Sequence, residues 1–204
     1  MKTFTSPTLR QRARFTVAGA LAAALLAAAP LAAHAQSAWP TRAVKVVVPY
    51  AAGSSPDVIM RIVAERLTPR LGQPVVIENR AGAGGNTGTG VVAKSPGDGY
   101  TFLISTNGPL VYNTQIYTKL GYDPFTELKP VVLAGTQANV CGVRADSGIN
   151  TLGDLVKAMK QNPGKYNFSS TGVGSLSHLG VELLKVKTDT FAVHIPYASS
   201  PLGI

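Results

Sequence analysis

Apolar and polar positions along the chain follow a pattern that predicts strands and helices in turn. A short β-branched run at 44–48 predicts a strand, and the apolar spacing within 57–71 predicts an amphipathic helix directly after it. The same order continues with a strand at 74–78, a helix at 84–93 and a strand at 101–105. Because a parallel neighbour needs a crossover long enough to hold a helix, this order indicates an α/β fold with parallel strands.

A turn-rich stretch at 107–130 interrupts the alternation, and a second series of elements follows it. In that series we expect strands at 131–134, 140–143, 166–169 and 191–195, and helices at 152–160 and 175–187. The break predicts a first α/β lobe over 36–135 and a second lobe over 136–204, with one hinge crossing near 131–136.

Residues 1–35 have the composition of a secretory signal peptide. A charge-free stretch at 15–33 ends in the small-x-small sequence Ala33-His34-Ala35, and four basic residues precede it: Lys2, Arg10, Arg12 and Arg14. Pro30 and the high alanine content argue against a membrane anchor, which would be more strongly apolar. We therefore expect export to the periplasm and a mature form that does not span the membrane.

We predict that this leader is removed between Ala35 and Gln36, because charge, apolar stretch and small-residue pattern occur in the required order. Mass spectrometry of the exported product should show a chain that begins at Gln36. A periplasmic product that retains Met1 would contradict the assignment.

Charge and cysteine content exclude several classes of function. Removal of the leader's basic residues lowers the formal net charge from +9 to +5. The remaining basic residues are scattered, which argues against nucleic-acid binding, while a mild positive field favours anionic ligands. Cys141 is the only cysteine, so an intramolecular disulfide and a multi-cysteine metal site are excluded. We expect it to pack in or beside a strand.

We expect the residues that bind a ligand to lie in the loops after the strands, because ligands of parallel α/β sheets bind beyond the carboxyl ends of the strands. The loop at 49–57 can present backbone N–H groups to an anion, and it is equally consistent with a plain helix start capped by Ser54 or Ser55. The loop at 169–179 places a run of hydroxyl residues and two glycines ahead of an apolar helix, which makes it the strongest anion-binding candidate.

Cofactor and catalytic signatures are weak. The glycine-rich segment at 79–88 has Thr87 where the third glycine of a dinucleotide-binding motif would stand, so we expect no nucleotide cofactor. Ser175 and His178 are three residues apart on one helix, with neither an orienting acid nor an oxyanion hole evident. The sequence therefore predicts a chain that is not an enzyme, in which His178 and His194 are packed side chains with one hydrogen-bonded nitrogen.

Several segments, in order along nearly the whole mature chain, carry a family resemblance. They are Pro49-Tyr50-Ala51-Ala52-Gly53 with Asp57, the sixteen residues from Leu71 to Asn86, Asp98-Gly99-Tyr100-Thr101, Tyr122-Asp123-Pro124, Asn162-Pro163-Gly164-Lys165, Gly172-Val173-Gly174-Ser175 with His178-Leu179, and His194-Ile195-Pro196-Tyr197. This set closely resembles the substrate-binding proteins of tripartite tricarboxylate transporters, the Bug family.

The resemblance implies a two-lobed Venus-flytrap protein, similar to type II periplasmic binding proteins, that closes on a small carboxylate such as a dicarboxylate, a tricarboxylate or an acidic amino acid. We expect no cofactor and no metal. The residues that match the family's pocket loops are Tyr50, Ala52, Gly53, Ser54, Ser55, Asp57, Thr106, Asn107, Ser170, Thr171, Gly172, Gly174, Ser175 and Tyr197. For Asp57 an orienting role in the first loop is the alternative to ligand contact.

Family members continue well beyond the position of Tyr197, so the resemblance also implies that the second lobe is incomplete here. The expected partners are the membrane subunits of a transporter. A ligand-sensing partner of a membrane sensor kinase is the alternative, and an α/β hydrolytic enzyme that uses Ser175 and His178 is less favoured.

Overall fold

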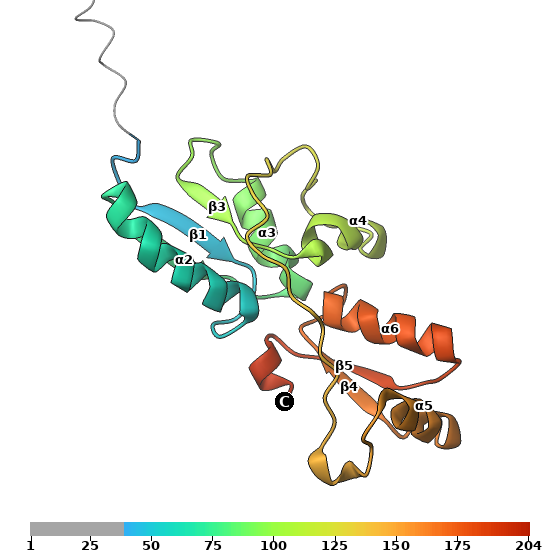
Figure 1. Ribbon diagram of the computed structural model, residues 1–204. Coiled ribbons are helices and arrows are strands. Elements are labelled where there is room, and N and C mark those ends of the chain that lie inside the picture. Colours follow the sequence, from blue (N-terminus) through green and yellow to red (C-terminus); the bar gives the residue numbers. More distant parts are fainter. Residues whose placement is uncertain (1–38) are drawn as a thin grey trace, which may run out of the picture. The chain divides into compact units, whose positions relative to one another are not determined.

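The first sheet has three parallel strands in the order β2-β1-β3 (Figure 1). The computed structural model describes residues 39–204, so the expected leader and its cleavage point lie outside the described residues. The strands are β1 (Val44–Val48), β2 (Val75–Asn79) and β3 (Thr101–Leu103). β1 lies in the centre because it pairs with β2 along one edge and with β3 along the other.

Two helices cross over between these strands. α2 (Ser55–Leu71) connects β1 to β2, and α3 (Asn86–Ala93) lies between β2 and β3. α2 presents one stripe to the sheet, and the resulting core contains Val46, Val48, Tyr50, Met60 and Ala64 with Leu67, Val75, Ile77, Phe102 and Ile104 around them. The helix ends at Gly72, whose left-handed backbone (φ 66°) suits glycine.

The central strand is buried on both faces. Val47 and Val48 are both 0% exposed, and consecutive side chains of a strand point to opposite faces. α2 packs against the face that carries Val48, and α3 also contacts β1 and β3. This two-sided burial explains why the strand is a continuous β-branched run rather than an alternation of apolar and polar residues.

The second sheet has two parallel strands, β4 (Asn167–Ser170) and β5 (Val193–Pro196), which α6 (Leu176–Thr188) connects (Figure 1). α5 (Leu152–Gln161) precedes β4, and Thr151 and Asp154 form a capping box at its amino terminus. The α/β class with parallel strands is therefore confirmed in both sheets. Residues 42–204 form one compact unit.

The predicted strands at 131–134 and 140–143 are wrong. Residues 128–144 form an extended connection without secondary structure, yellow to orange in Figure 1. Val131, Val132 and Leu133 are between 75% and 80% exposed. The two valines are β-branched, which favours a strand only where a neighbouring strand supplies hydrogen bonds and packing, and none does so among the described residues. The predicted lobe boundary near 135 falls in this connection and stays a prediction.

Two smaller expectations also differ from the structure. Cys141 is exposed, so the expectation that it packs in or beside a strand is wrong, because the segment around it forms no strand. The turn-rich stretch contains a π-helical turn, η3 (Gly108–Tyr112), which continues into α4 (Asn113–Ile116). Within residues 39–204, no helix is long and apolar enough to cross a membrane.

Candidate functional site

The loop between β1 and α2 is built around the buried carboxylate of Asp57, which is 2% exposed. The Gly53 N–H donates to Asp57 Oδ2 at 2.9 Å, and the Asn79 amide donates to Asp57 Oδ1 at 2.9 Å. Arg61 adds an ion pair at 3.0 Å. Burial alone would raise the pKa of Asp57, but its bonds to Arg61, Gly53 and Asn79 together hold that pKa below its ordinary value. Asp57 therefore stays ionised and fixes the shape of the loop.

Ser54 begins α2 but does not cap it with its side chain. Its hydroxyl makes no cap hydrogen bond to the first turn, and the residue is only 3% exposed. Ser54 Oγ has no hydrogen-bond partner among the described residues. A buried polar atom without a partner is costly, so this hydroxyl is available to bind a ligand.

Tyr50 and Thr106 connect the ends of β1 and β3. Their hydroxyl groups share a hydrogen bond of 2.6 Å. Tyr50 is 4% exposed, and burial raises the pKa of its phenol, so the group is neutral near pH 7. The Tyr50 hydroxyl is thus hydrogen-bonded to Thr106, and the residue lines the two cavities described below.

The second anion-binding candidate is the loop from Ser170 to Ser175, which leads into α6. Ser175 Oγ caps the helix by accepting from the His178 N–H at 3.3 Å. The Thr171 N–H donates to Ser177 Oγ at 3.2 Å, and the Gly172 N–H donates to Ser170 Oγ at 3.0 Å. The predicted amino-terminal hydroxyl cluster therefore exists, and its members are held by hydrogen bonds to one another and to the backbone.

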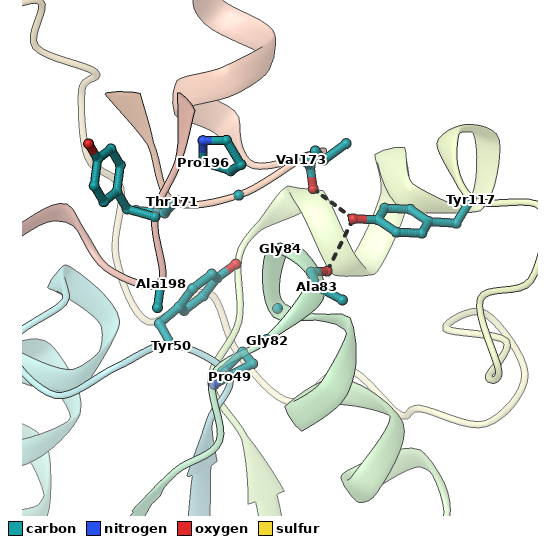
Figure 2. A pocket seen from close by; sticks show the side chains of 13 residues that line it. Pro49, Tyr50, Gly82, Ala83, Gly84, Tyr117, Thr171, Val173, Pro196 and Ala198 are labelled. Atoms are coloured by element: carbon teal, nitrogen blue, oxygen red, sulfur yellow. Dashed lines mark hydrogen bonds between the residues drawn. The ribbon is translucent and has the colours of Figure 1, made fainter. Parts of the chain in front are cut away.

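The loop from Ser170 to Ser175 packs closely against two segments near the first sheet, one at Gly84 and one at Gly108. Figure 2 shows the Tyr117 hydroxyl directed at the carbonyl oxygens of Val173 and Ala83, at 3.1 Å and 3.4 Å. A Cβ on Gly84 would lie 2.2 Å from the Val173 carbonyl oxygen, and a Cβ on Gly108 would lie 2.7 Å from the Gly174 carbonyl oxygen. Side chains at these positions would prevent the approach, so glycine is required for the two loops to meet.

Two cavities lie where the loops meet. The smaller one, about 80 Å³, is lined by Tyr50, Ser54, Ser55, Pro56, Thr106, Gln137, Asn139, Thr171, Ser175, Leu176, Ser177 and Ser200. The larger one, about 330 Å³, is lined by Pro49, Tyr50, Gly82, Ala83, Gly84, Gly85, Tyr117, Thr171, Gly172, Val173, Pro196, Tyr197 and Ala198 (Figure 2). Tyr50 and Thr171 line both. Neither lining contains Lys, Arg, His, Asp or Glu, so any charge bound there would meet neutral groups and helix termini.

The residues predicted from the resemblance divide between these cavities and the frame that supports them. Those that line the smaller cavity are Tyr50, Ser54, Ser55, Thr106, Thr171 and Ser175. Those that line the larger cavity are Tyr50, Thr171, Gly172 and Tyr197. Those that line neither are Ala52, Gly53, Asp57, Asn107, Ser170 and Gly174. The last group includes Asp57, Gly53 and Ser170, whose hydrogen bonds hold the two loops in shape.

Sequence reasoning missed several lining residues. Gln137 and Asn139 lie between the predicted hinge at 131–136 and the predicted strand at 140–143, and the Asn139 amide donates to the Leu176 carbonyl at 3.1 Å. Tyr117 lies in the stretch that was read only as turns. Ser177 belongs to the hydroxyl-rich loop at 169–179, so the sequence pattern could have identified it. Tyr117 and Asn139 could not be identified from the residues around them, because their hydrogen-bond partners lie far along the chain.

Ser175 and His178 do not form a nucleophile and base. Ser175 Oγ accepts from the backbone N–H of His178, and the His178 ring accepts at Nδ1 from the Gly174 N–H at 3.3 Å. The two side chains therefore have separate structural partners. Among residues 39–204 no group of His, Cys, Asp or Glu side chains could hold a metal ion.

Two parallel α/β sheets whose strand-end loops converge on neutral, hydroxyl-lined cavities have the arrangement of a solute-binding protein. The family model described as tripartite tricarboxylate transporter family receptor matches residues 59–204. The chain belongs to this family, as the motifs of the sequence predicted.

Two curated relatives show the extent of the match. A protein of Pseudomonas sp. (strain P51), described as the UPF0065 protein in the tcbD-tcbE intergenic region, is 40% identical over 80% of this chain and 48% of its own length. Protein BugT of Bordetella pertussis is 37% identical over 79% of this chain and 50% of its own. The chain thus spans about half the length of the curated relatives it matches.

Two solved structures share the fold. An R. palustris protein with adipate is 37% identical, with a TM-score of 0.78 over 80% of this chain and 55% of that one. MatC from Rhodopseudomonas palustris with bound malate is 26% identical, with a TM-score of 0.71 over 79% of this chain and 55% of that one. The family is one of receptors rather than enzymes, which confirms the prediction that the chain is not an enzyme.

Proposed function

We propose that this chain belongs to an exported receptor that captures a small carboxylate in the periplasm and delivers it to the membrane subunits of a transporter. The family and the two ligand-bound structures support a carboxylate ligand, since adipate and malate are both small dicarboxylates. Within this chain, one carboxylate group of the ligand binds in the smaller cavity and the rest of the ligand extends toward the larger one, which shares Tyr50 and Thr171.

The observation that carries this proposal is the convergence of two helix amino termini on the smaller cavity. Ser54 and Ser55 come from the start of α2, and Ser175 and Ser177 come from the start of α6. The amino terminus of a helix carries a partial positive charge, and its first-turn N–H groups have no partner within the helix. Two first-turn positions do not contribute an N–H here, because Pro56 has none and the His178 N–H donates to Ser175 Oγ. The partial charge and the remaining first-turn N–H groups attract an anion, and the buried Ser54 hydroxyl adds a donor with no other partner.

Magnitudes indicate that several groups must act together. A helix terminus contributes about 0.3 to 1 kcal/mol to an exposed charge and up to about 2 kcal/mol when the charge is partly buried. Micromolar affinity requires about 8 kcal/mol, so two termini are insufficient. The remaining contribution comes from neutral donors, among which Thr106, Gln137 and Asn139 line the same cavity. A site of neutral donors also avoids the cost of burying a cationic side chain.

Replacing Ser54 with alanine tests the proposal. We expect affinity for malate or adipate to fall about 2- to 10-fold, the contribution of one hydrogen bond, as measured by titration calorimetry. The midpoint of thermal unfolding should stay the same or rise, because the hydroxyl has no partner in the fold. Ser147→Ala, which changes an exposed serine outside both cavities, is the control and should leave binding unchanged. Equal affinity in wild type and Ser54→Ala, or no binding of any small carboxylate, would contradict the proposal.

A further inference from the structure

Two histidines stack behind the loop that carries the second helix terminus. The ring centroids of His178 (α6) and His194 (β5) lie 4.1 Å apart with an interplanar angle of 29°. Phe168 (β4) continues the stack, with its centroid 4.9 Å from that of His194. Neither histidine lines a cavity. They lie outside the linings of the two cavities described above, so carboxylate capture does not account for them directly.

Each histidine holds one end of the loop from Ser170 to Ser175. The Gly174 N–H donates to His178 Nδ1 at 3.3 Å. His194 Nε2 forms a hydrogen bond of 2.6 Å with Ser170 Oγ, which also accepts from the Gly172 N–H. These contacts fix the backbone N–H groups of the loop in the orientation that the helix terminus requires.

The two hydrogen bonds respond differently to protonation. His178 accepts at Nδ1, so that nitrogen must carry no proton, and an imidazolium has no acceptor at all. Ser170 Oγ can instead accept from a protonated His194, because a hydroxyl both donates and accepts. Protonation of His178 therefore breaks the contact to Gly174, whereas protonation of His194 alone leaves its contact to Ser170 in place.

We propose that His178 and His194 are positioning residues for the anion-binding loop, and that His178 keeps its contact to the loop only while its ring is neutral, so that carboxylate affinity falls as the pH drops. This inference rests on the proposed function, since it concerns the regulation of the same site. The release of Gly174 loosens the loop that leads to Ser175 and the start of α6.

The charged groups around the pair have opposing effects. Glu182 Oε1 lies 3.8 Å from His178 Nε2 and favours the imidazolium, while Lys185 binds Glu182 at 2.8 Å and sits over the rings of Phe168 and Phe191. Burial lowers the pKa of His178, with Lys185 acting in the same direction against Glu182. Burial and the facing His178 lower the pKa of His194. Both rings are therefore neutral near pH 7.

The sign of the pH effect follows from these lowered values. An unfolded chain takes up protons on these histidines near the ordinary value of about 6.5, before the folded chain does. Their contribution to folding is thus fully present above that value and is lost as the pH falls below it. The folded His178 ring takes up its proton at a lower pH than the unfolded chain does, and that step breaks the contact to Gly174. Stability therefore begins to decline at a higher pH than loop order.

Nuclear magnetic resonance of the ¹⁵N-labelled chain between pH 5 and 8 tests the loop directly and needs no ligand. We expect the Gly174 amide resonance to shift with the midpoint of the His178 ring, below the ordinary value of about 6.5, and the protection factor of that amide against hydrogen exchange to fall. A Gly174 amide that stays unchanged while the His178 ring titrates would overturn the inference. This outcome is separate from the proposed function, which depends on binding alone.

Calorimetric titration with malate then compares variants at matched pH values, which cancels protonation of the ligand itself. His178→Phe keeps a ring but no acceptor, and it should bind about 2- to 10-fold more weakly than wild type at pH 7.5. His178→Asn should recover part of the lost affinity, because its amide oxygen can accept a hydrogen bond. Since that amide does not titrate, the ratio of wild-type affinity to His178→Asn affinity should fall on acidification. Lys187→Gln, which changes an exposed residue of the same helix, should reproduce the wild-type profile. A wild-type affinity that rises on acidification relative to His178→Asn would show that added positive charge dominates, and the inference would be wrong.

Discussion

Replacing Gly174 with alanine should lower the free energy of unfolding by about 2 to 5 kcal/mol and strongly reduce carboxylate binding. Its backbone is left-handed (φ 80°), which costs an alanine about 1 to 2 kcal/mol. A Cβ there would also lie 1.9 Å from Asn113 Oδ1, and a forced fit of this kind costs about 1 to 3 kcal/mol more. Denaturant unfolding measures the first effect, and calorimetry with malate measures the second.

Two other glycines separate backbone strain from collision. Gly121 has almost the same backbone angle (φ 81°), but a Cβ there meets nothing within 4 Å. Gly97 also has open space around it and no left-handed strain. We expect Gly121→Ala to show the strain alone and Gly97→Ala to be nearly neutral, both with unchanged affinity. Equal losses of stability and binding in all three variants would refute the docking of the second loop against Asn113.

Replacing Asp57 with asparagine should destabilise the chain by about 2 to 4 kcal/mol, because Gly53, Asn79 and Arg61 all donate to this one buried charged acceptor. The folded-state pKa of Asp57 lies below the ordinary carboxyl value of about 3.9, so its contribution is fully present above that pH and is lost as the pH falls through the folded value. The difference between wild type and Asp57→Asn in urea unfolding should therefore be constant from pH 7 to 5 and shrink below pH 4.

Asp146 supplies the control for this variant. It also pairs with an arginine, Arg144, but its side chain is 67% exposed rather than 2%. Exposed ion pairs contribute little, so Asp146→Asn should not change the unfolding midpoint. If Asp57→Asn also left the unfolding midpoint unchanged, the loop between β1 and α2 would not depend on the buried carboxylate.

The elements that could be predicted from sequence are those in which the order of apolar and polar residues indicates which side chains are buried. The β-branched run of β1 and the apolar spacing of α2 both show, in the residues themselves, which faces of the element are buried. The connection at 128–144 has similar residues, yet it forms no strand because a strand also requires a partner, which a local pattern does not reveal.

The same distinction applies to the candidate site. Ser54, Thr171 and Ser175 were identifiable because they follow strands, where the topology of a parallel sheet delivers them to one edge. Tyr117 and Asn139 reach the site through contacts with Val173 and Leu176, which are 56 and 37 residues away in sequence. Contacts of that kind depend on how the loops dock, and no local periodicity encodes them.

The central place of β1 has a consequence for the order of folding. This strand is the first in the described chain, yet its partners are Val75–Asn79 on one edge and Thr101–Leu103 on the other. Neither edge can be satisfied by a local hairpin, and pairing over such long loops is intrinsically slow. During synthesis the first sheet cannot close until residue 103 has left the ribosome, so the nascent chain remains unfolded for longer than one that begins with a hairpin.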